Sequence, residues 1–262
     1  MAIYQLNRRK GHKFFMSAAV FGFCMSRVVT CILRIALATR PHNARLAIAA
    51  NIFTSAGVLV LYIVVQILAQ RLLKATHPQL GWSRPFKTIS TVLYAVVPVA
   101  LVLVIVFTII SFYTLNPTLR SVALWVQRGS ILYLLIFNVV SVGIFLLSLL
   151  LPRSQDRRDF GTGSVTSKRI ILALAIFFIV FTAGFRAGTV WAAPRPASDP
   201  AWYDTKSAFY VIELGFEIII VYLLLLTRFD HRFWVPNGSK RPGDYHQLTD
   251  LVAVKDSFYE KA

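Results

Sequence analysis

The sequence carries little charge and very few acidic residues. Charged residues make up 15% of the chain, and only 11 of its 262 residues are Asp or Glu. Soluble domains carry about 25% charged residues, and disordered chains are poor in apolar residues. Here hydrophobic residue types account for 56% of the chain, and the mean hydropathy is +0.63. This balance excludes a soluble globular domain and a disordered chain, and it predicts a polytopic membrane protein.

Cysteine is scarce, and the common catalytic and metal-binding motifs are missing. Cys24 and Cys31 are seven residues apart on one predicted helix, which separates them by about 10 Å along the axis, too far for a disulfide. The sequence has no His-x-x-x-His pair, no Walker A loop and no nucleophile elbow, and no histidine or lysine falls in the middle of an apolar stretch. We therefore expect no enzymatic activity, no metal site and no cofactor.

The net charge is nevertheless strongly positive. The chain has 28 Lys and Arg, which gives a formal net charge of +17. A chain this basic suggests nucleic-acid binding at first. The basic residues, however, stand in short runs between long apolar stretches, and a base-reading face would need a polar surface that the composition does not provide. We expect a lipid bilayer as the partner, and no nucleic acid.

Six apolar stretches are long enough to cross a bilayer, which takes about 20 residues of helix. They lie near residues 14–38, 46–70, 88–112, 126–151, 169–191 and 208–227. The predicted fold class is therefore all-α, a six-helix transmembrane bundle over 14–227. Residues 1–13 form a short segment before it, and 228–262 form a basic tail after it. Pro98 predicts a kink in the third span, where neighbouring groups must satisfy the freed carbonyl.

The distribution of basic residues predicts the orientation. Nineteen Lys and Arg fall on the side of the bundle that holds both termini, five fall on the other side, and four lie within the spans. The positive-inside rule then places both termini in the cytoplasm. A missed or additional span would destroy this alternation, so the charges support six spans independently of hydropathy. We expect a multi-pass protein of the plasma membrane.

Ionisable residues at membrane depth are the most informative feature, because each costs at least about 2.5 kcal/mol unless it is paired or hydrated. Arg27 and Arg34 share one face of the first span, and Glu213 and Glu217 share one face of the sixth. Counting residues from the span ends places Arg34, Arg186 and Glu213 in the outer third of the membrane. Arg27 and Glu217 fall near its middle. The five residues predict a buried cluster of ion pairs.

Two interpretations of this cluster stay open. It is either a hydrated pocket for a ligand or a polar headgroup, or a set of pairs that fixes helix packing and register. Asn51, Gln66 and Asn138 would join the cluster if their helices turn them inward. In the fifth span, Gly184 and Gly188 form a small-xxx-small pattern that permits close helix approach.

The cytoplasmic segments suggest two kinds of partner. The loop between the fourth and fifth spans carries Arg153, Arg157 and Arg158, and we expect it to contact anionic lipid headgroups. The pattern of the tail predicts a short amphipathic helix over 248–259, which favours packing on the membrane surface. A cytoplasmic signalling partner would also use these basic segments.

Several motifs resemble those of an uncharacterised fungal family of multi-span membrane proteins, whose members are often labelled family-C-like G-protein-coupled receptors. The motifs are Phe185-Arg186-Ala187-Gly188-Thr189-Val190-Trp191, Lys206-Ser207-Ala208-Phe209-Tyr210, Glu217 with Tyr222, Arg228-Phe229-Asp230-His231-Arg232-Phe233, Val235-Pro236-Asn237-Gly238-Ser239, and, earlier in the chain, Arg27 to Ala36 and His77 to Trp82. The resemblance implies a receptor-like membrane protein whose domain has no assigned function.

A more distant similarity is to the fungal lipid-translocating exporter family. It rests on Arg186 and on Glu217 with Tyr222, whereas Asp230 lies too far along the chain for that family's acidic position. Both families imply seven helices with the amino terminus outside. The six spans of this sequence and the seven helices of these families agree if a first helix precedes this chain in the full-length protein.

Three functions follow from these observations. The first is a receptor or sensor that uses Arg27, Arg34, Arg186, Glu213 and Glu217 as a ligand pocket. The second is a transporter that passes lipids or small amphiphiles across the membrane through the same residues. The third is a structural scaffold, which needs no ligand.

Overall fold

A computed structural model of the chain describes residues 5, 14–40, 43–152, 160–192, 201–235 and 239. The described part contains helices and no strand. The long helices are α2 (Phe15–Thr39), α3 (Ala44–Thr76), α5 (Arg84–Tyr113), α6 (Pro117–Leu150), α7 (Val165–Trp191) and α9 (Phe216–Leu226). The arginines at 153, 157 and 158, the predicted tail helix and residues 1–4 and 6–13 lie outside the described residues.

Four short elements complete the fold. They are α4 (Pro78–Gly81), the 3₁₀ turn η1 (Trp202–Asp204), α8 (Lys206–Ala208) and α10 (Phe229–Arg232). In addition, the first part of the sixth span, Phe209–Gly215, is a π-helix, η2, that runs directly into α9. The sixth span is therefore not the regular α-helix that the sequence predicts.

Local sequence signals explain where the helices begin. The side chain of Asn43 accepts hydrogen bonds from the backbone N–H groups of Arg45 and Leu46 at the start of α3. Asn116 caps α6 in the same way, with Pro117 in the first turn, where its missing N–H has no cost. Ser164 caps α7 through the N–H of Ser167. Each of these three apolar helices thus begins directly after a polar residue whose side chain satisfies a free backbone N–H group.

Several helices extend beyond the spans that hydropathy predicts. Helix α3 runs to Thr76 rather than residue 70, and α6 begins at Pro117 rather than residue 126. The added turns contain Arg71, Lys74 and Arg120. Basic residues end an apolar window but not a helix, because Lys and Arg are good helix formers. Six described helices are long and apolar enough to cross a membrane, the sixth being η2 and α9 together (Phe209–Leu226), as a multi-pass membrane protein requires.

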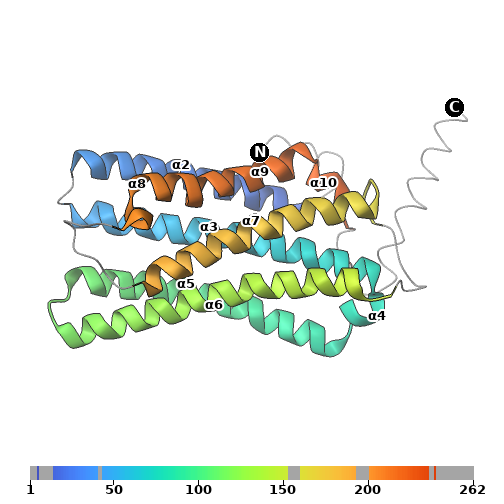
Figure 1. Ribbon diagram of the computed structural model, residues 1–262, viewed down its shortest axis with the longest axis horizontal. Coiled ribbons are helices and arrows are strands. Elements are labelled where there is room, and N and C mark those ends of the chain that lie inside the picture. The colour runs from blue at the N-terminus through green and yellow to red at the C-terminus, as the bar shows by residue number, and fades with distance from the viewer. Residues whose placement is uncertain are drawn as a thin grey trace, which may run out of the picture.

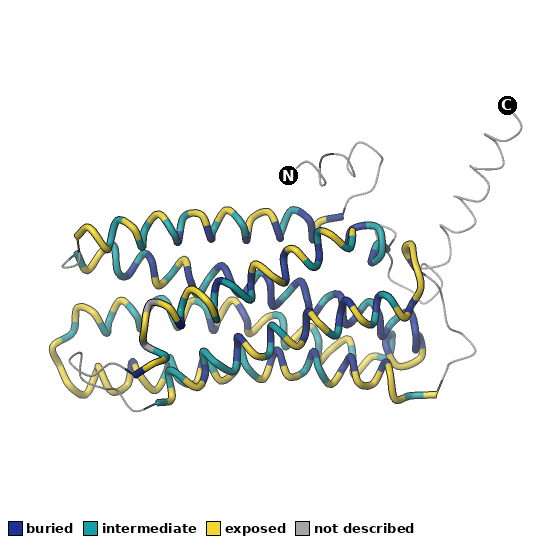
Figure 2. Tube along the Cα trace, turned by 45° about the horizontal axis from the view of Figure 1, so that its top comes forward, coloured by how far each residue is buried: buried dark blue, intermediate teal, exposed yellow. Residues whose placement is uncertain are grey.

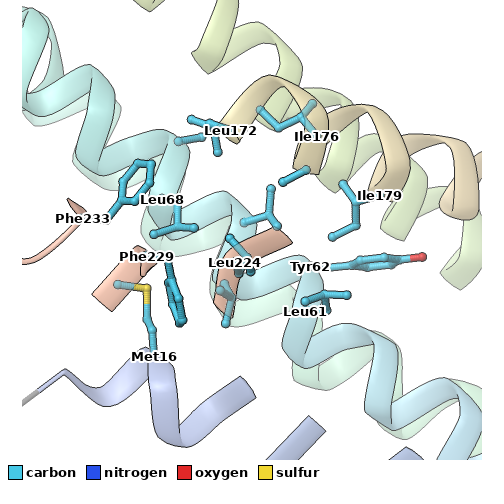
Figure 3. Close-up of a cluster of buried hydrophobic side chains, with 14 of the residues drawn as sticks. Met16, Leu61, Tyr62, Leu68, Leu172, Ile176, Ile179, Leu224, Phe229 and Phe233 are labelled. Carbon is cyan, nitrogen blue, oxygen red and sulfur yellow. The ribbon is translucent and has the colours of Figure 1, made fainter. Parts of the chain in front are cut away.

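Helix α3 is the centre of the bundle. It packs against α2, α5, α6 and α7, and most of its central residues are buried. The long helices lie side by side in an elongated bundle (Figure 1). Buried residues gather along its interior and exposed residues along its outside (Figure 2). Close to α3, side chains of α2, α3, α7, α9 and α10 form a compact apolar cluster (Figure 3).

The outward faces of the bundle are apolar. Helix α5 exposes large side chains along its whole length, among them Val92, Val99, Val102, Val106 and Ile109. Soluble proteins rarely expose apolar patches larger than a few hundred Å². A lipid environment accounts for such a surface, because lipid tails are as apolar as these side chains.

The first and last long helices meet mainly through long side chains. One end of the bundle holds the start of α2 and the end of α9, and we name it the inner end after the predicted orientation. There the rings of Phe14 and Phe229 are 5.3 Å apart. Midway along α2, Arg27 reaches Glu217, and near its outer end Arg34 lies over Phe209. Two of these three contacts involve an arginine that the sequence places at membrane depth.

Arginines also organise the inner end. Arg232 donates from Nε to the Thr227 carbonyl at 2.7 Å and from a terminal nitrogen to Ser167 Oγ at 2.7 Å. Arg71 donates to the Phe233 carbonyl at 2.8 Å. The backbone N–H of Thr162 donates to the His231 carbonyl at 3.0 Å. These bonds tie the turn before α7 and the end of α3 to α10.

Candidate intramembrane polar site

The best-buried ion pair joins α2 to α9. Arg27 Nε lies 2.6 Å from Glu217 Oε2, and a terminal nitrogen of Arg27 donates to Glu217 Oε1 at 2.7 Å. The Glu217 side chain is only 2% exposed and that of Arg27 11%. One of these two contacts is a charge-assisted hydrogen bond, and the other, between Nε and Oε2, is a close contact of opposite charges. The pair therefore keeps both charges compensated in the apolar interior.

Helix α3 also contacts this ion pair. A terminal nitrogen of Arg27 donates to the Thr54 carbonyl at 3.1 Å. One turn further along α3, Gly57 has no side chain, and a Cβ there would collide with Ser26 Oγ and lie 3.3 Å from Arg27 Cζ. The glycine thus leaves the space that the guanidinium needs. Arg27 links α2, α3 and α9 through one side chain.

The second ion pair joins α7 to η2. A terminal nitrogen of Arg186 donates to Glu213 Oε2 at 3.1 Å, and both side chains are partly exposed, at 17% and 13%. Glu213 lies within the π-helical turn and Glu217 lies in α9. The two carboxylates, four residues apart, reach arginines on different helices. Single π-turns inside α-helices occur frequently at functional sites.

Arg34 does not take part in an ion pair among the described residues. We expected it in the outer layer with Arg186 and Glu213. Its guanidinium carbon instead lies 3.5 Å from the centroid of the Phe209 ring. A ring face attracts a cation electrostatically, so this contact compensates part of the charge. Glu213 turns toward α7 rather than toward α2, which leaves the aromatic ring as the neighbour of Arg34.

A cavity of about 170 Å³ lies in the outer half of the bundle, between α3, α5, α6, α7 and η2. Arg186 and Glu213 line it together, so the outer ion pair faces an open space. Ser55, Tyr62 and Thr189 add polar groups to the wall. Figure 3 shows the Tyr62 ring pointing away from the apolar cluster, with its hydroxyl at the far end. The remaining wall is apolar and includes Leu59, Leu101, Val104, Ile131, Leu134 and Leu135.

The amides that we considered as further members of the ion-pair cluster, Asn51, Gln66 and Asn138, do not contact either ion pair. Asn51 is exposed on α3, so the condition for its joining the cluster, an inward-facing position, is not met. Gln66 and Asn138 are fully buried, but they lie between α3 and α6 rather than at an ion pair. There Gln66 accepts a hydrogen bond from Ser141. Nor do the glycines at 184 and 188 provide a close helix contact, since a Cβ on either would have no atom within 4 Å.

Sequence reasoning missed the cavity wall contributed by α3. Ser55 and Tyr62 are seven residues apart, which places them on one stripe of a helix. This spacing could have identified a polar stripe on the second span. The search for ionisable groups at membrane depth overlooked both residues, because neither carries a charge at neutral pH.

The described residues contain no group of three or more His, Cys, Asp or Glu side chains that could hold a metal ion. Cys24 and Cys31 are half-buried and free. The polar groups that line the cavity, Arg186 and Glu213 with Ser55, Tyr62 and Thr189, offer hydrogen bonds and one charge pair.

Comparison with known proteins gives one match. Residues 163–234 match a family described as protein of unknown function (DUF3112). The matched segment runs from the turn before α7 to the end of α10 and contains Arg186, Glu213 and Glu217. Neither the curated proteins nor the solved structures include a match. The comparisons lend no support to the receptor label or to kinship with the lipid exporters.

Proposed function

We propose that this protein is a receptor- or sensor-like membrane protein that binds a small amphiphile in its outer-half cavity. The observation that carries the proposal is a cavity of about 170 Å³ with an ion pair, Arg186 and Glu213, in one wall and mostly apolar side chains around it. Ligand pockets characteristically combine an apolar lining with a few placed polar groups. An intramembrane charge is by default a candidate functional residue.

The chemistry of the wall indicates the class of ligand. Arg186 donates hydrogen bonds and Glu213 accepts them, and together they carry no net charge. A ligand group that offers both an acceptor and a donor, either zwitterionic or neutral and polar, can contact both without leaving a charge uncompensated. The apolar lining fits an aliphatic or aromatic portion. A cavity of about 150 Å³ holds a molecule of the size of benzene, so the site suits a small amphiphile or one end of a longer one.

The connection of the cavity to the inner end favours a sensor. Glu213 lines the cavity and belongs to η2, which continues into α9 and, after the turn at Arg228, into α10. Helix α10 is bound in turn by α3 and by the turn before α7. A ligand that draws Glu213 away from Arg186 would act on this continuous helix. A cytoplasmic partner would then bind at the inner end.

Thermal stability in lipid nanodiscs tests ligand binding. The probes share an eight-carbon chain and carry a hydroxyl, a zwitterionic, a carboxylate or an ammonium head. We expect the zwitterionic or hydroxyl probe to raise the Tm most, because a ligand that binds only the folded state stabilises it. Ala183→Leu, which fills the cavity, and Arg186→Gln should abolish this rise. Arg120→Gln, at an exposed arginine of the same end, is the matched control and should keep it. Equal Tm shifts in all variants would contradict the proposal.

A translocator of lipids or small amphiphiles is the second candidate. The observation that favours it is the presence of two ion pairs at successive depths, Arg186 with Glu213 and, further in, Arg27 with Glu217. A headgroup could pass from one to the next. Fluorescent-phospholipid translocation in proteoliposomes distinguishes this function, and Glu217→Gln should abolish the flux. Folded protein without flux would exclude it, and the additional absence of any probe-dependent Tm shift would favour a scaffold.

A further inference from the structure

A group of neutral polar side chains is buried directly beneath the cavity, between α3 and α6. Gln66, Asn138 and Ser141 are 0% exposed. Ser141 Oγ donates to Gln66 Oε1, and Asn138 Nδ2 donates to the Leu134 carbonyl at 2.8 Å. Leu134 lines the cavity, as does Tyr62, one turn outward from Gln66 on α3. The buried group therefore begins at the floor of the cavity.

Two of these side chains keep an atom without a hydrogen-bond partner among the described residues. Gln66 Nε2 has nothing to donate to, and Asn138 Oδ1 accepts nothing. One turn further inward on α3, Gln70 Nε2 is in the same situation, and Gln70 is 7% exposed. The great majority of buried polar side-chain atoms have a partner, either protein or ordered water. Unpartnered donors and an unpartnered acceptor along one seam indicate a bound species that can both accept and donate.

The chemistry of the seam selects that species. Gln66, Gln70, Asn138 and Ser141 are all uncharged, so an ion placed there would meet no opposite charge and would be strongly disfavoured. An apolar molecule would leave the amides unpartnered. Water accepts and donates, and it is small enough for a closely packed interior. Because successive polar positions on α3 are about 6 Å apart along the axis, one or two waters span each interval.

We propose that ordered water molecules bind in the seam between α3 and α6. Gln66 Nε2 donates to one water, which donates to Asn138 Oδ1. Further waters continue inward along α3 to Gln70. The seam is then a hydrated extension of the outer-half cavity toward the inner half of the bundle. This inference goes beyond the proposed function and does not depend on which ligand the cavity binds. It assigns a role to buried amides that join neither ion pair.

X-ray hydroxyl-radical footprinting tests for this water, because radicals formed from bound water modify the buried side chains beside it. Phe137, which is 0% exposed and directly precedes Asn138, is the reporter. Phe229, also 0% exposed, lies in the apolar cluster and is the internal reference. We expect modification of Phe137 to be several-fold faster than that of Phe229. Equal rates in the native protein would overturn the proposal.

The double variant Gln66→Leu with Asn138→Leu removes the unpartnered atoms and should reduce the Phe137 rate to that of Phe229. Asn51→Leu makes the same chemical change at an exposed position of α3 and should leave the rate unaltered. If the double variant does not fold, Gln66→Met alone, which removes the donor, should lower the rate. Fast modification of Phe137 that persists in these variants would refute the assignment, since the water would not be held by these amides.

Discussion

Arg27 makes three polar contacts at membrane depth, two with Glu217 and one with the Thr54 carbonyl. Removing one partner of a buried ion pair leaves an uncompensated charge, which costs about 3–5 kcal/mol. Replacing such a pair with apolar residues is much less costly. Losing one of the two charges therefore lowers the free energy of unfolding more than replacing both side chains together.

This dependence predicts different outcomes for two substitutions of Glu217. Glu217→Gln keeps an oxygen that accepts from Arg27 but removes the compensating charge, so we expect a folded protein with a clearly lowered Tm, by less than the full loss of about 3–5 kcal/mol would give. Glu217→Arg places a second cation beside Arg27, and we expect no stably inserted protein, because the penalty approaches the whole free energy of unfolding. Fluorescence-detected size-exclusion chromatography of heated samples measures both. Arg27→Glu combined with Glu217→Arg should recover part of the folded fraction; a monodisperse Glu217→Arg protein would show that the two side chains are not paired.

Gly57 provides a second test at the residue scale. Gly57→Ala introduces a Cβ that collides with Ser26 Oγ and crowds Arg27, and we expect a loss of about 1–3 kcal/mol. The matched control is Gly143→Ala on α6, where a Cβ meets no atom within 4 Å. That variant should be neutral or more stable by up to about 1 kcal/mol, since alanine is the better helix former. Adding Ser26→Ala to Gly57→Ala should restore part of the lost Tm; no such recovery would place the cost elsewhere.

At the scale of elements, the π-helix η2 decides which way Glu213 points. Its seven residues, Phe209–Gly215, are directly continuous with α9. A π-helical turn contains more residues than an α-helical turn. It therefore changes the angle between Glu213 and Glu217 that an α-helix with the same sequence would give. The outer ion pair depends on this local irregularity.

Deleting Gly215 tests the role of the π-helix. The deletion places Glu213 three residues before Glu217 and, in a regular α-helix, changes its direction around the helix axis relative to Glu217. We expect the protein to fold, because one residue fewer favours regular α-helical bonding, but to lose the Arg186–Glu213 pair. A double-mutant cycle on Arg186 and Glu213, followed by thermal unfolding, should give a coupling energy near zero in the deletion variant. Gly215→Ala keeps the spacing and should retain the coupling; an undiminished coupling in the deletion variant would contradict this role.

At the scale of the whole molecule, the basic inner end predicts the orientation. Leu80→Cys in α4 and Leu115→Cys between α5 and α6 place thiols at opposite ends of the bundle, at exposed positions. With Cys24 and Cys31 replaced by serine, we expect a membrane-impermeant maleimide to label the 115 thiol on intact cells. It should label the 80 thiol only after permeabilisation, since the positive-inside rule places that end in the cytoplasm. The reverse pattern would invert the proposed orientation of the cavity.

The amino-acid sequence by itself determined the all-α class and the six spans, because hydropathy and helical period are local properties of the chain. It also indicated that Arg27 lies at the depth of Glu217 and Arg186 at that of Glu213, since depth follows from counting residues along a helix. These predictions need no knowledge of which helices are neighbours.

Only the tertiary structure decided how the helices are arranged around α3 and how each is rotated. That arrangement turns Asn51 outward, sets Arg34 over the Phe209 ring, and brings Tyr62 and Glu213 to one cavity from segments far apart in sequence. It also buries Gln66 against Ser141 of α6. The physical reason is that every span is apolar on most of its faces, so the hydrophobic pattern specifies neither neighbours nor rotation. Side-chain packing between helices fixes both.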